Sequence, residues 1–391
     1  MTSAVTSLLA LDEAAALELV AAHGGRPFHA RILRDEVLGK GNLDYAGMSA
    51  LPERLREHLA QHVPVLCGRE VARTRARDGT TKLLIAFPRP GARDATIETV
   101  HIPPSDPASG KGATLCVSTQ VGCPLACSFC ATGALGFQRN LSTAEIVDQV
   151  CRGRELLEGQ RRITNVVFMG MGEPLLNLDA VLEAVRILVH PKALAMAPRR
   201  VTVSTVGVLP GIGPLLETAP VKLAVSLHAT TDEVRDRLVP LNRRFPLAKL
   251  LGALRRLDRV NARHPVFFEY TLIDGINDGL EDARRLVTLL KGIPSKVNLI
   301  PLNPHAGSAL RPSPEGVIDR FLRELAALGA TVTLRRSRGS DIDAACGQLA
   351  LRRSGELGRM PRLARGMAAP AAPPSADQAA AFGDRKATRR P

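Results

Sequence analysis

Short apolar runs alternate with longer amphipathic stretches through the middle of the chain. Runs rich in Val, Ile, Leu and Thr predict strands at residues 114–119, 163–169, 200–205, 221–227, 265–272, 296–301 and 331–336. Between them, stretches such as 142–157 and 280–292 repeat apolar residues with the spacing of a helix face. Strands and helices in this alternation form βαβ units, so we expect an α/β fold with a parallel sheet or barrel.

The repeat and the segments on either side of it suggest four regions. Six or seven βα units suit a partial (β/α)6 barrel, which we place at residues 113–353, with its chemistry at the C-terminal ends of the strands. Residues 1–66 predict a small, basic helical domain, and residues 67–112 predict a connector made of β-hairpins. The Ala- and Pro-rich residues 354–391 predict a disordered tail.

The composition is that of a globular protein. The 391 residues are 45% hydrophobic and 23% charged, which excludes a fibrous chain, a fully disordered chain and a disulfide-stapled mini-protein. No apolar run reaches the roughly 18 residues that span a bilayer. The start of the chain carries acids where an export signal carries bases. We therefore expect a cytoplasmic protein with no membrane partner.

An excess of basic residues narrows the class of partner. Lys and Arg number 52 and Asp and Glu 38, which gives a formal net charge of +14. Such an excess indicates a polyanionic partner, most often a nucleic acid, although an Arg-rich surface without that partner has the same composition. Aromatic residues are only 3% of the chain, so we expect RNA to be held through its phosphates rather than by stacking on rings.

Three of the seven cysteines stand in one loop. Cys123, Cys127 and Cys130 follow the first predicted barrel strand with the spacing C-x3-C-x2-C. In a chain without an export signal, such clustering points to metal or redox chemistry rather than to disulfides. Three thiolates can hold three irons of a cubane iron–sulfur cluster and leave the fourth iron open to a non-protein ligand. Zinc is the alternative, and its fourth ligand could come from Cys116, His228 or His305.

Polar residues also stand where the predicted strands end. Gly172 and Glu173 belong to MGMGEP, directly after the strand at 163–169. Glycine permits a close backbone approach and a carboxylate suits an ammonium group, though this segment is also typical of an ordinary strand-to-helix turn. Later strand ends carry Ser204, Ser226, Leu227, His228 and Asn303. Each alone is typical of a turn or a cap, but together they lie on the face where a barrel binds its ligands.

Taken together, these segments resemble the RlmN/Cfr family of radical S-adenosylmethionine (SAM) RNA methyltransferases. The three-cysteine loop, with an aromatic residue before its last cysteine, resembles the radical SAM superfamily as a whole. The likeness to the family runs from about residue 20 to 351 and includes CVSTQVGCPLACSFCATGALGFQRNL, FMGMGEPLLN, RVTVSTVG, LAVSLHA, NLIPLNP and RGSDIDAACGQLA. The last motif, which contains Cys346, specifies the family together with Cys116.

This resemblance implies the cofactors and a role for each residue. Cys123, Cys127 and Cys130 would ligate one 4Fe–4S cluster. SAM would be surrounded by Gly172, Glu173, Ser204, Ser226, Leu227, His228 and Asn303. Cys346 would carry the methyl group, Cys116 would be its resolving partner, and Glu98 would be the base.

The family's reaction uses two SAM molecules per turnover, because the target carbon of adenine is too electron-poor to attack a methyl group. The first SAM methylates the Cys346 thiolate. The second is cleaved to a 5′-deoxyadenosyl radical, which takes a hydrogen from the S-methyl group so that the resulting carbon radical adds to adenine. Glu98 then removes the ring proton, and Cys116 releases the RNA by forming a disulfide with Cys346.

Several assignments depend on the resemblance alone. We expect methylation of carbon 2 of an adenosine in 23S rRNA, and of tRNA beside the anticodon, with a flavodoxin-like electron donor and a disulfide reductant as further partners. A Cfr-like enzyme that methylates carbon 8, or a non-catalytic zinc-containing RNA-binding protein, are the alternatives. Without the resemblance, the local pattern around Glu98 predicts an exposed hairpin residue, and Cys346 is typical of an unreactive small hydrophobic residue in a turn. Cys67 and Cys151 have no assigned role.

Overall fold

The computed structural model describes residues 7–88, 94–106, 109, 111–157, 162–218, 220–305 and 308–349. These residues form a ten-stranded sheet with the order β1-β2-β3-β4-β7-β8-β9-β10-β11-β12 and a separate pair, β5-β6. The predicted tail at 354–391 lies outside the described residues.

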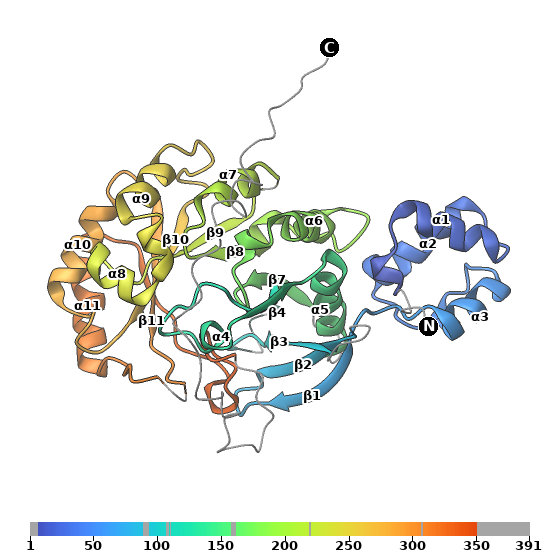
Figure 1. The fold of residues 1–391 in the computed structure, drawn as a ribbon, viewed down its shortest axis with the longest axis horizontal. Coiled ribbons are helices and arrows are strands. Elements are labelled where there is room, and N and C mark those ends of the chain that lie inside the picture. Colours follow the sequence, from blue (N-terminus) through green and yellow to red (C-terminus); the bar gives the residue numbers. More distant parts are fainter. Residues whose placement is uncertain are drawn as a thin grey trace, which may run out of the picture. The chain divides into compact units, whose positions relative to one another are not determined.

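The parallel part of the large sheet confirms the predicted βα pattern. Its strands are β4 (Ala113–Cys116), β7 (Ile163–Phe168), β8 (Val201–Thr205), β9 (Lys222–Ser226), β10 (Val266–Leu272), β11 (Ser295–Pro301) and β12 (Val332–Leu334). Each pairs in parallel with the next from β4 onward. The units from β4 to β11 make the expected partial (β/α)6 barrel, and the short β12 extends it (Figure 1).

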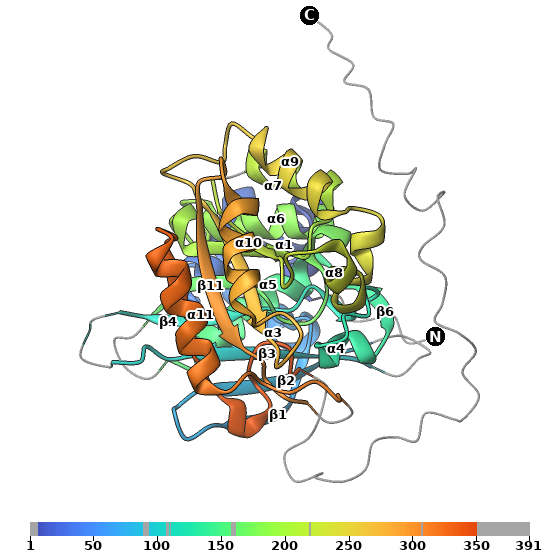
Figure 2. The same cartoon turned by 90° about the vertical axis from the view of Figure 1, so that its left-hand side faces the viewer.

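Helices cover the outer face of the barrel (Figures 1 and 2). They are α5 (Thr143–Glu155), α6 (Leu178–Val189), α7 (Leu209–Thr218), α9 (Leu247–Arg255), α10 (Leu280–Leu290) and α11 (Glu315–Ala327). In α10 the residues Ala283, Leu286 and Leu290 are buried at helical spacing, so one apolar stripe faces the sheet. None of the helices in the described part of the chain has both the length and the apolarity that crossing a membrane requires.

Three antiparallel strands extend the sheet before β4. These are β1 (Arg69–Arg75), β2 (Thr81–Phe87) and β3 (Ala95–Ile102), and β3 pairs with β4 so that Val100 stands opposite Cys116. All of β2 and most of β3 are buried, and Glu98 is 0% exposed. The expectation that Glu98 is an exposed hairpin residue is therefore wrong. The segment around Asp343 contacts the β1–β2 hairpin at Lys82, whose Nζ lies 3.2 Å from the carbonyl oxygen of Asp343.

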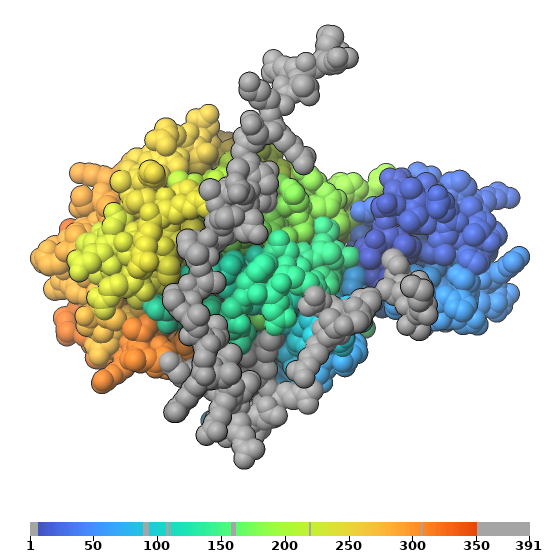
Figure 3. All heavy atoms as spheres, viewed as in Figure 1, coloured from blue at the N-terminus to red at the C-terminus, as the bar shows by residue number. Residues whose placement is uncertain are grey.

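The first helices of the chain pack on one another. They are α1 (Glu13–Ala22), α2 (Pro27–Arg34) and α3 (Glu53–His62), and they bury Val20, Leu33, Leu55 and Leu59. Arg154 of α5 donates hydrogen bonds to the carbonyls of Leu38 (2.6 Å) and Gly39 (2.9 Å). In Figure 3 these helices are the blue surface beside the green surface of the barrel. The boundaries proposed for the regions at 1–66, 67–112 and 113–353 stay predictions.

Candidate active site

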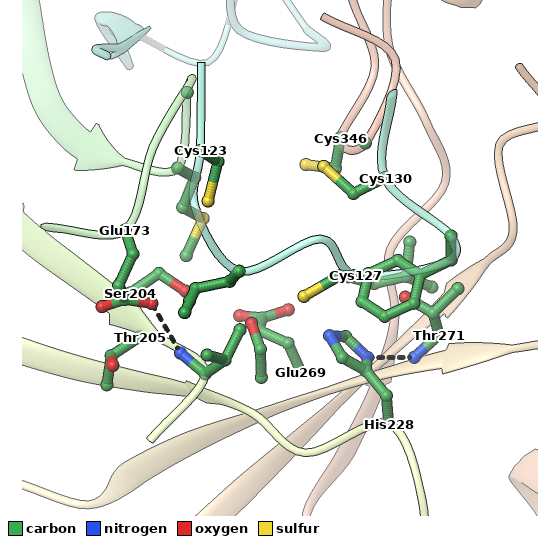
Figure 4. Close-up of a pocket in the computed structure, with 18 of the residues that line it drawn as sticks. Cys123, Cys127, Cys130, Glu173, Ser204, Thr205, His228, Glu269, Thr271 and Cys346 are labelled. Atoms are coloured by element: carbon green, nitrogen blue, oxygen red, sulfur yellow. Dashed lines mark hydrogen bonds between the residues drawn. The ribbon is translucent and has the colours of Figure 1, made fainter. Parts of the chain in front are cut away.

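A cavity lies at the C-terminal ends of the parallel strands (Figure 4). Most of the predicted site residues line it: Cys123, Cys127, Cys130, Gly172, Glu173, Ser204, Ser226, His228, Asn303 and Cys346. Glu98, Cys116 and Leu227 do not line this cavity. The chain thus brings together residues from the three-cysteine loop, from the strand ends and from the segment after β12.

The three-cysteine loop is held in shape at both ends. Before it, β5 (Gln120–Gly122) pairs with β6 (Phe137–Asn140), a small sheet that the sequence pattern did not predict. The backbone N–H of Cys123 donates to the carbonyl of Gly136 at 2.9 Å. Gly122 has φ +76°, and a Cβ there would stand 1.8 Å from that same carbonyl oxygen, so only glycine allows this closure. After the loop, α4 (Ala131–Ala134) begins next to Cys130.

These cysteines fit an iron–sulfur cluster better than a lone zinc ion. Burial raises the pKa of Cys123 to about 12, and it also raises the pKa of Cys127 and of Cys130. The thiolates that ligation requires are thus stable only beside a cation, which iron would supply. All three cysteines line one cavity (Figure 4), and three thiolates match the three protein-held irons of a 4Fe–4S cluster, whereas structural zinc takes four protein ligands.

Gly172 and Glu173 form a tight turn after β7. Gly172 has φ +101°, and a Cβ there would stand 2.6 Å from the Cβ of Gln120, so the close approach needs glycine. The Glu173 carboxylate accepts hydrogen bonds from the backbone N–H groups of Leu175 (3.1 Å) and Val206 (3.0 Å). Burial raises the pKa of Glu173 to about 7 despite these bonds. A cationic amino group in the cavity would favour the ionised form.

His228 is fixed in one orientation beside the cysteine loop. Its Nδ1 accepts a hydrogen bond from the backbone N–H of Thr271 at 3.0 Å, and its ring meets Phe129 edge-on at 4.5 Å between centroids. Burial lowers the pKa of His228 to about 3, so the ring is neutral. With Nδ1 as an acceptor, the proton belongs on Nε2, and His228 offers a donor to the cavity (Figure 4).

The backbone of His228 is strained, and Asn277 holds it. His228 has φ +59°, a left-handed conformation that a residue with a side chain rarely adopts. Asn277 Nδ2 donates to the carbonyl oxygens of His228 and Thr271, both at 2.7 Å. Asn277 therefore ties the end of β9 to β10 and fixes the ring of His228 by way of its backbone.

Leu227 occupies a different position from its neighbours Ser226 and His228. It is 0% exposed and belongs to the hydrophobic core, and its side chain does not line this cavity. Its carbonyl oxygen accepts a hydrogen bond from Arg235 Nε at 2.9 Å. Arg235, in α8 (Asp232–Leu238), also donates to the carbonyl oxygens of Val206 and Ser226. This buried guanidinium holds the ends of β8 and β9 together.

The segment after β12 carries Cys346 to the cavity. Asn303 Nδ2 donates to the carbonyl of Cys346 at 3.0 Å, and the backbone N–H of Ala131 donates to the carbonyl of Gly347 at 2.7 Å. Asn303 thus does more than line the cavity, because it also fixes the backbone of Cys346. The three-cysteine loop and the Cys346 segment are bound to each other directly.

Cys116 and Cys346 meet at a second cavity, which adjoins the first. Cys346, Met169, Ile300 and Arg335 line both cavities, and Cys116 lines the second. Burial, followed by the proximity of the Cys346 sulfur, raises the pKa of Cys116 to about 12. Cys116 is therefore a neutral thiol in the absence of a base or of a rearrangement that exposes it.

The β1–β2 hairpin holds the Cys346 segment from the other side. Arg338 Nε donates to the Asp78 carboxylate at 2.6 Å, and the backbone N–H of Arg77 donates to the Asp341 carboxylate at 3.1 Å. Lys82 adds its contact with the Asp343 carbonyl. Residues separated by about 260 positions are thereby joined, which keeps Cys346 at the mouth of the barrel.

Glu98 faces the same side of the sheet as Cys116. It stands two residues before Val100, whose strand partner is Cys116, and alternate residues of a strand share a face. Its carboxylate forms an ion pair with Lys82, with 2.9 Å between Oε1 and Nζ. Glu98 thus points toward the interior of the barrel without lining either cavity.

Sequence reasoning missed several polar residues of the site. Glu269 and Thr271 in β10 line the first cavity, and Arg335 lines both. The sequence did contain a signal for Glu269, because VFFEYTL places one acidic residue inside a mostly apolar strand. A buried acid in a central strand requires partners or a ligand.

Known proteins resemble this chain over most of its length. A profile described as the radical SAM superfamily matches residues 117–287. The dual-specificity RNA methyltransferase RlmN of Syntrophobacter fumaroxidans is 47% identical over 333 residues, which cover 85% of this chain and 94% of the relative. The protein of the same description from Geobacter sulfurreducens is 45% identical over 326 residues, which cover 83% and 87%.

A solved structure has the same fold. The radical SAM methyltransferase from Sphaerobacter thermophilus superposes with a TM-score of 0.80 at 42% sequence identity. The match covers 88% of this chain and 99% of that one.

Proposed function

This chain belongs to the RlmN family of radical SAM methyltransferases, and from that membership we propose that it methylates carbon 2 of an adenosine in 23S rRNA. We extend the proposal to an adenosine of tRNA beside the anticodon, because the two relatives are described as dual-specificity RNA methyltransferases. One observation carries the proposal: Cys116 and Cys346, 230 positions apart (346 − 116), line a common cavity beside the three-cysteine loop.

The enzyme uses a 4Fe–4S cluster and SAM, as its family does. When bound, the cluster supplies one electron, and SAM supplies both the methyl group and the 5′-deoxyadenosyl radical. We assign Cys123, Cys127 and Cys130 as the ligands of the cluster, supported by their common cavity. The residues proposed to surround SAM are Gly172, Glu173, Ser204, Ser226, His228 and Asn303, with Leu227 contributing only through its backbone.

Cys346 is proposed as the methyl carrier. Its sulfur must be a thiolate to attack a methyl group. Desolvation in the cavity raises the pKa of Cys346, although part of the residue is exposed, and the Arg335 guanidinium opposes that shift. Arg335 therefore favours the reactive form of the carrier. The two-sided support of the Cys346 segment, by Asn303 and by the β1–β2 hairpin, limits where the sulfur can go.

Cys116 and Glu98 are proposed for the later steps. Glu98 would take the ring proton of the modified adenine as a general base, and its ion pair with Lys82 suits a carboxylate that is charged before the transfer. Once the unpaired electron of the adduct has returned to the cluster, the Cys116 thiolate would attack the sulfur of Cys346. A disulfide would then form, the bond from sulfur to the methylene carbon would break, and that carbon would take up a proton to become the methyl group. A disulfide reductant and a flavodoxin-like electron donor are the proposed partners, and the cytoplasm is the proposed location.

A Cfr-like methylation at carbon 8 would use the same cysteines, so product analysis must distinguish the two. We propose mass spectrometry of nucleosides from rRNA and tRNA of a strain that lacks this protein. Loss of 2-methyladenosine from 23S rRNA supports the assignment to carbon 2. Loss of 8-methyladenosine while 2-methyladenosine is retained would assign the reaction to carbon 8 instead. Unchanged nucleosides would contradict the proposed function.

A further inference from the structure

Glu269 is a buried carboxylate with one oxygen unused. It belongs to β10 and is 4% exposed. Its Oε1 accepts hydrogen bonds from Asn298 Nδ2 at 2.9 Å and from Arg335 at 3.5 Å. Its Oε2 is buried and has no hydrogen-bond partner in the described part of the protein. A buried carboxylate oxygen left in this state is costly, and such atoms are rare in folded proteins.

The position of Glu269 directs this oxygen toward a ligand. The strand register sets Glu269 opposite Ser226 on β9 and opposite Asn298 on β11, in a row across three parallel strands. Figure 4 shows the carboxyl group inside the cavity, between Ser204 and His228 and on the side of Cys127. Because Asn298 and Arg335 both bind Oε1, Oε2 is the carboxylate oxygen left for a ligand of the cavity that Glu269 lines.

The missing partner must be a hydrogen-bond donor. A carboxylate can only accept, so an N–H or O–H group of the ligand is required. Burial raises the pKa of Glu269, so its charge is disfavoured there, and a hydrogen-bond donor beside Oε2 would reduce that cost. Both molecules that the proposed function brings to this cavity contain adenosine, which offers ribose hydroxyls and an exocyclic amino group.

We propose that Glu269 is an adenosine-binding residue, whose Oε2 accepts a hydrogen bond from an amino or hydroxyl group of adenosine. The proposal rests on the proposed function for the identity of the ligands. The adenosine belongs either to SAM or to the RNA target, and the two sources have the same chemistry. It adds to the site a residue that acts on binding rather than on cluster assembly.

Glu269→Gln is the decisive variant, because it keeps the volume of the side chain and inverts its hydrogen bonding. Asn298 and Arg335 would hold the amide oxygen in the place of Oε1, so the amide NH2 would take the place of Oε2. A donor would then face the donor of the ligand. We expect at least a tenfold weaker affinity for one of the two ligands, whereas Glu233→Gln, which removes an exposed carboxylate from α8, should change neither.

The experiment measures equilibrium binding to full-length, cluster-containing protein under anaerobic conditions. One arm titrates SAM and its 2′- and 3′-deoxyribose analogues; the other titrates an RNA hairpin with adenosine or purine riboside at the target position. One analogue lacks the group that donates to Glu269. Wild-type protein should bind this analogue more weakly than the parent ligand, whereas Glu269→Gln should bind the two equally well. If Glu269→Gln binds the SAM analogue as well as it binds SAM, the adenosine belongs to SAM. If it instead binds the purine riboside hairpin as well as the adenosine hairpin, the adenosine belongs to RNA.

The proposal would be overturned if Glu269→Gln bound SAM and RNA with affinities within twofold of wild type. In that case each analogue would also lose the same affinity, relative to its parent ligand, in both proteins. This result would show that Oε2 is satisfied by water. Iron and sulfide content, together with the thermal unfolding midpoint, report whether Glu269→Gln is folded and loaded. The proposed function fails separately, if wild type itself binds neither SAM nor RNA.

Discussion

The Lys82 ammonium and the Glu98 carboxylate form an ion pair inside the protein, 2.9 Å apart, with side chains only 5% and 0% exposed. The same ammonium binds the carbonyl of Asp343, three residues before Cys346. One buried lysine thus contacts both the residue proposed as the base and the segment that carries the proposed methyl carrier.

Replacing Lys82 by Met should be strongly destabilising, because it removes the cation that pairs with the buried Glu98 carboxylate. Breaking one side of a buried pair costs about 3–5 kcal/mol. Denaturant unfolding of Lys82→Met measures this loss, with Lys249→Met on the exposed face of α9 as the control. Adding Glu98→Leu should recover part of the stability, since the pair is then replaced by apolar groups. A loss below about 1 kcal/mol in the single variant would show that the pair is screened by water.

Alanine at Cys123, Cys127 or Cys130 should abolish SAM cleavage, because each variant removes one proposed ligand of the cluster. Formation of 5′-deoxyadenosine with a chemical reductant is the measurement. Cys151→Ala is the matched control, since Cys151 is buried in α5 and lines neither cavity. Cleavage at the wild-type rate by any of the three variants would refute the ligand assignment.

Alanine at each of the two remaining cysteines of the mechanism should block the reaction at a different step. Cys346→Ala removes the methyl carrier, so it should bind SAM and RNA but form neither adduct nor product. Cys116→Ala keeps the carrier and lacks the thiol that releases the RNA, so it should accumulate protein cross-linked to RNA. A denaturing gel shows the adduct as a shifted band that ribonuclease collapses. Purified Cys116→Ala that carries no RNA and still turns over would remove Cys116 from the mechanism.

Acid should destabilise the protein partly through His228. Its folded pKa, about 3, lies below its unfolded value. Between about pH 6.5 and pH 3 the unfolded chain therefore binds a proton that the native protein refuses, and stability falls as the pH falls. The slope contributed by one such group is about 1.4 kcal/mol per pH unit. Unfolding free energies of wild type and His228→Gln between pH 6 and pH 4 should differ in slope by about that amount, and parallel slopes would contradict the buried neutral ring.

RNA affinity should depend strongly on salt if phosphates provide the binding energy. The logarithm of the affinity should fall linearly with the logarithm of the salt concentration, with a slope of roughly −0.7 to −0.9 per neutralised phosphate. Filter binding of a 23S rRNA fragment over a salt series measures the slope. Binding that does not change with salt would mean that the net charge of +14 serves another purpose.

The strands and the cysteine loop could be predicted because their signals are local. The apolar period of the segments near 163–169 and 265–272 predicted β7 and β10, and the spacing of the cysteines predicted the iron–sulfur cofactor that the family uses. Glu98 could not be placed from its own pattern. Its burial depends on Lys82 and on a segment more than 240 positions away, which no local period reports. The side chain of Leu227 lies in the core while its neighbours Ser226 and His228 line the cavity, a difference that the sequence pattern did not indicate.

The contacts between the β1–β2 hairpin and the Cys346 segment also set an order of events during protein synthesis. A ribosome makes the chain from its N-terminus, so Arg77, Asp78 and Lys82 emerge long before Asp341 and Asp343. Cys130 precedes Cys346 by 216 positions (346 − 130). A nascent chain can therefore fold its barrel and present its cysteine loop while the hairpin is still uncovered. The site becomes complete only when the last strand and the segment behind it are translated.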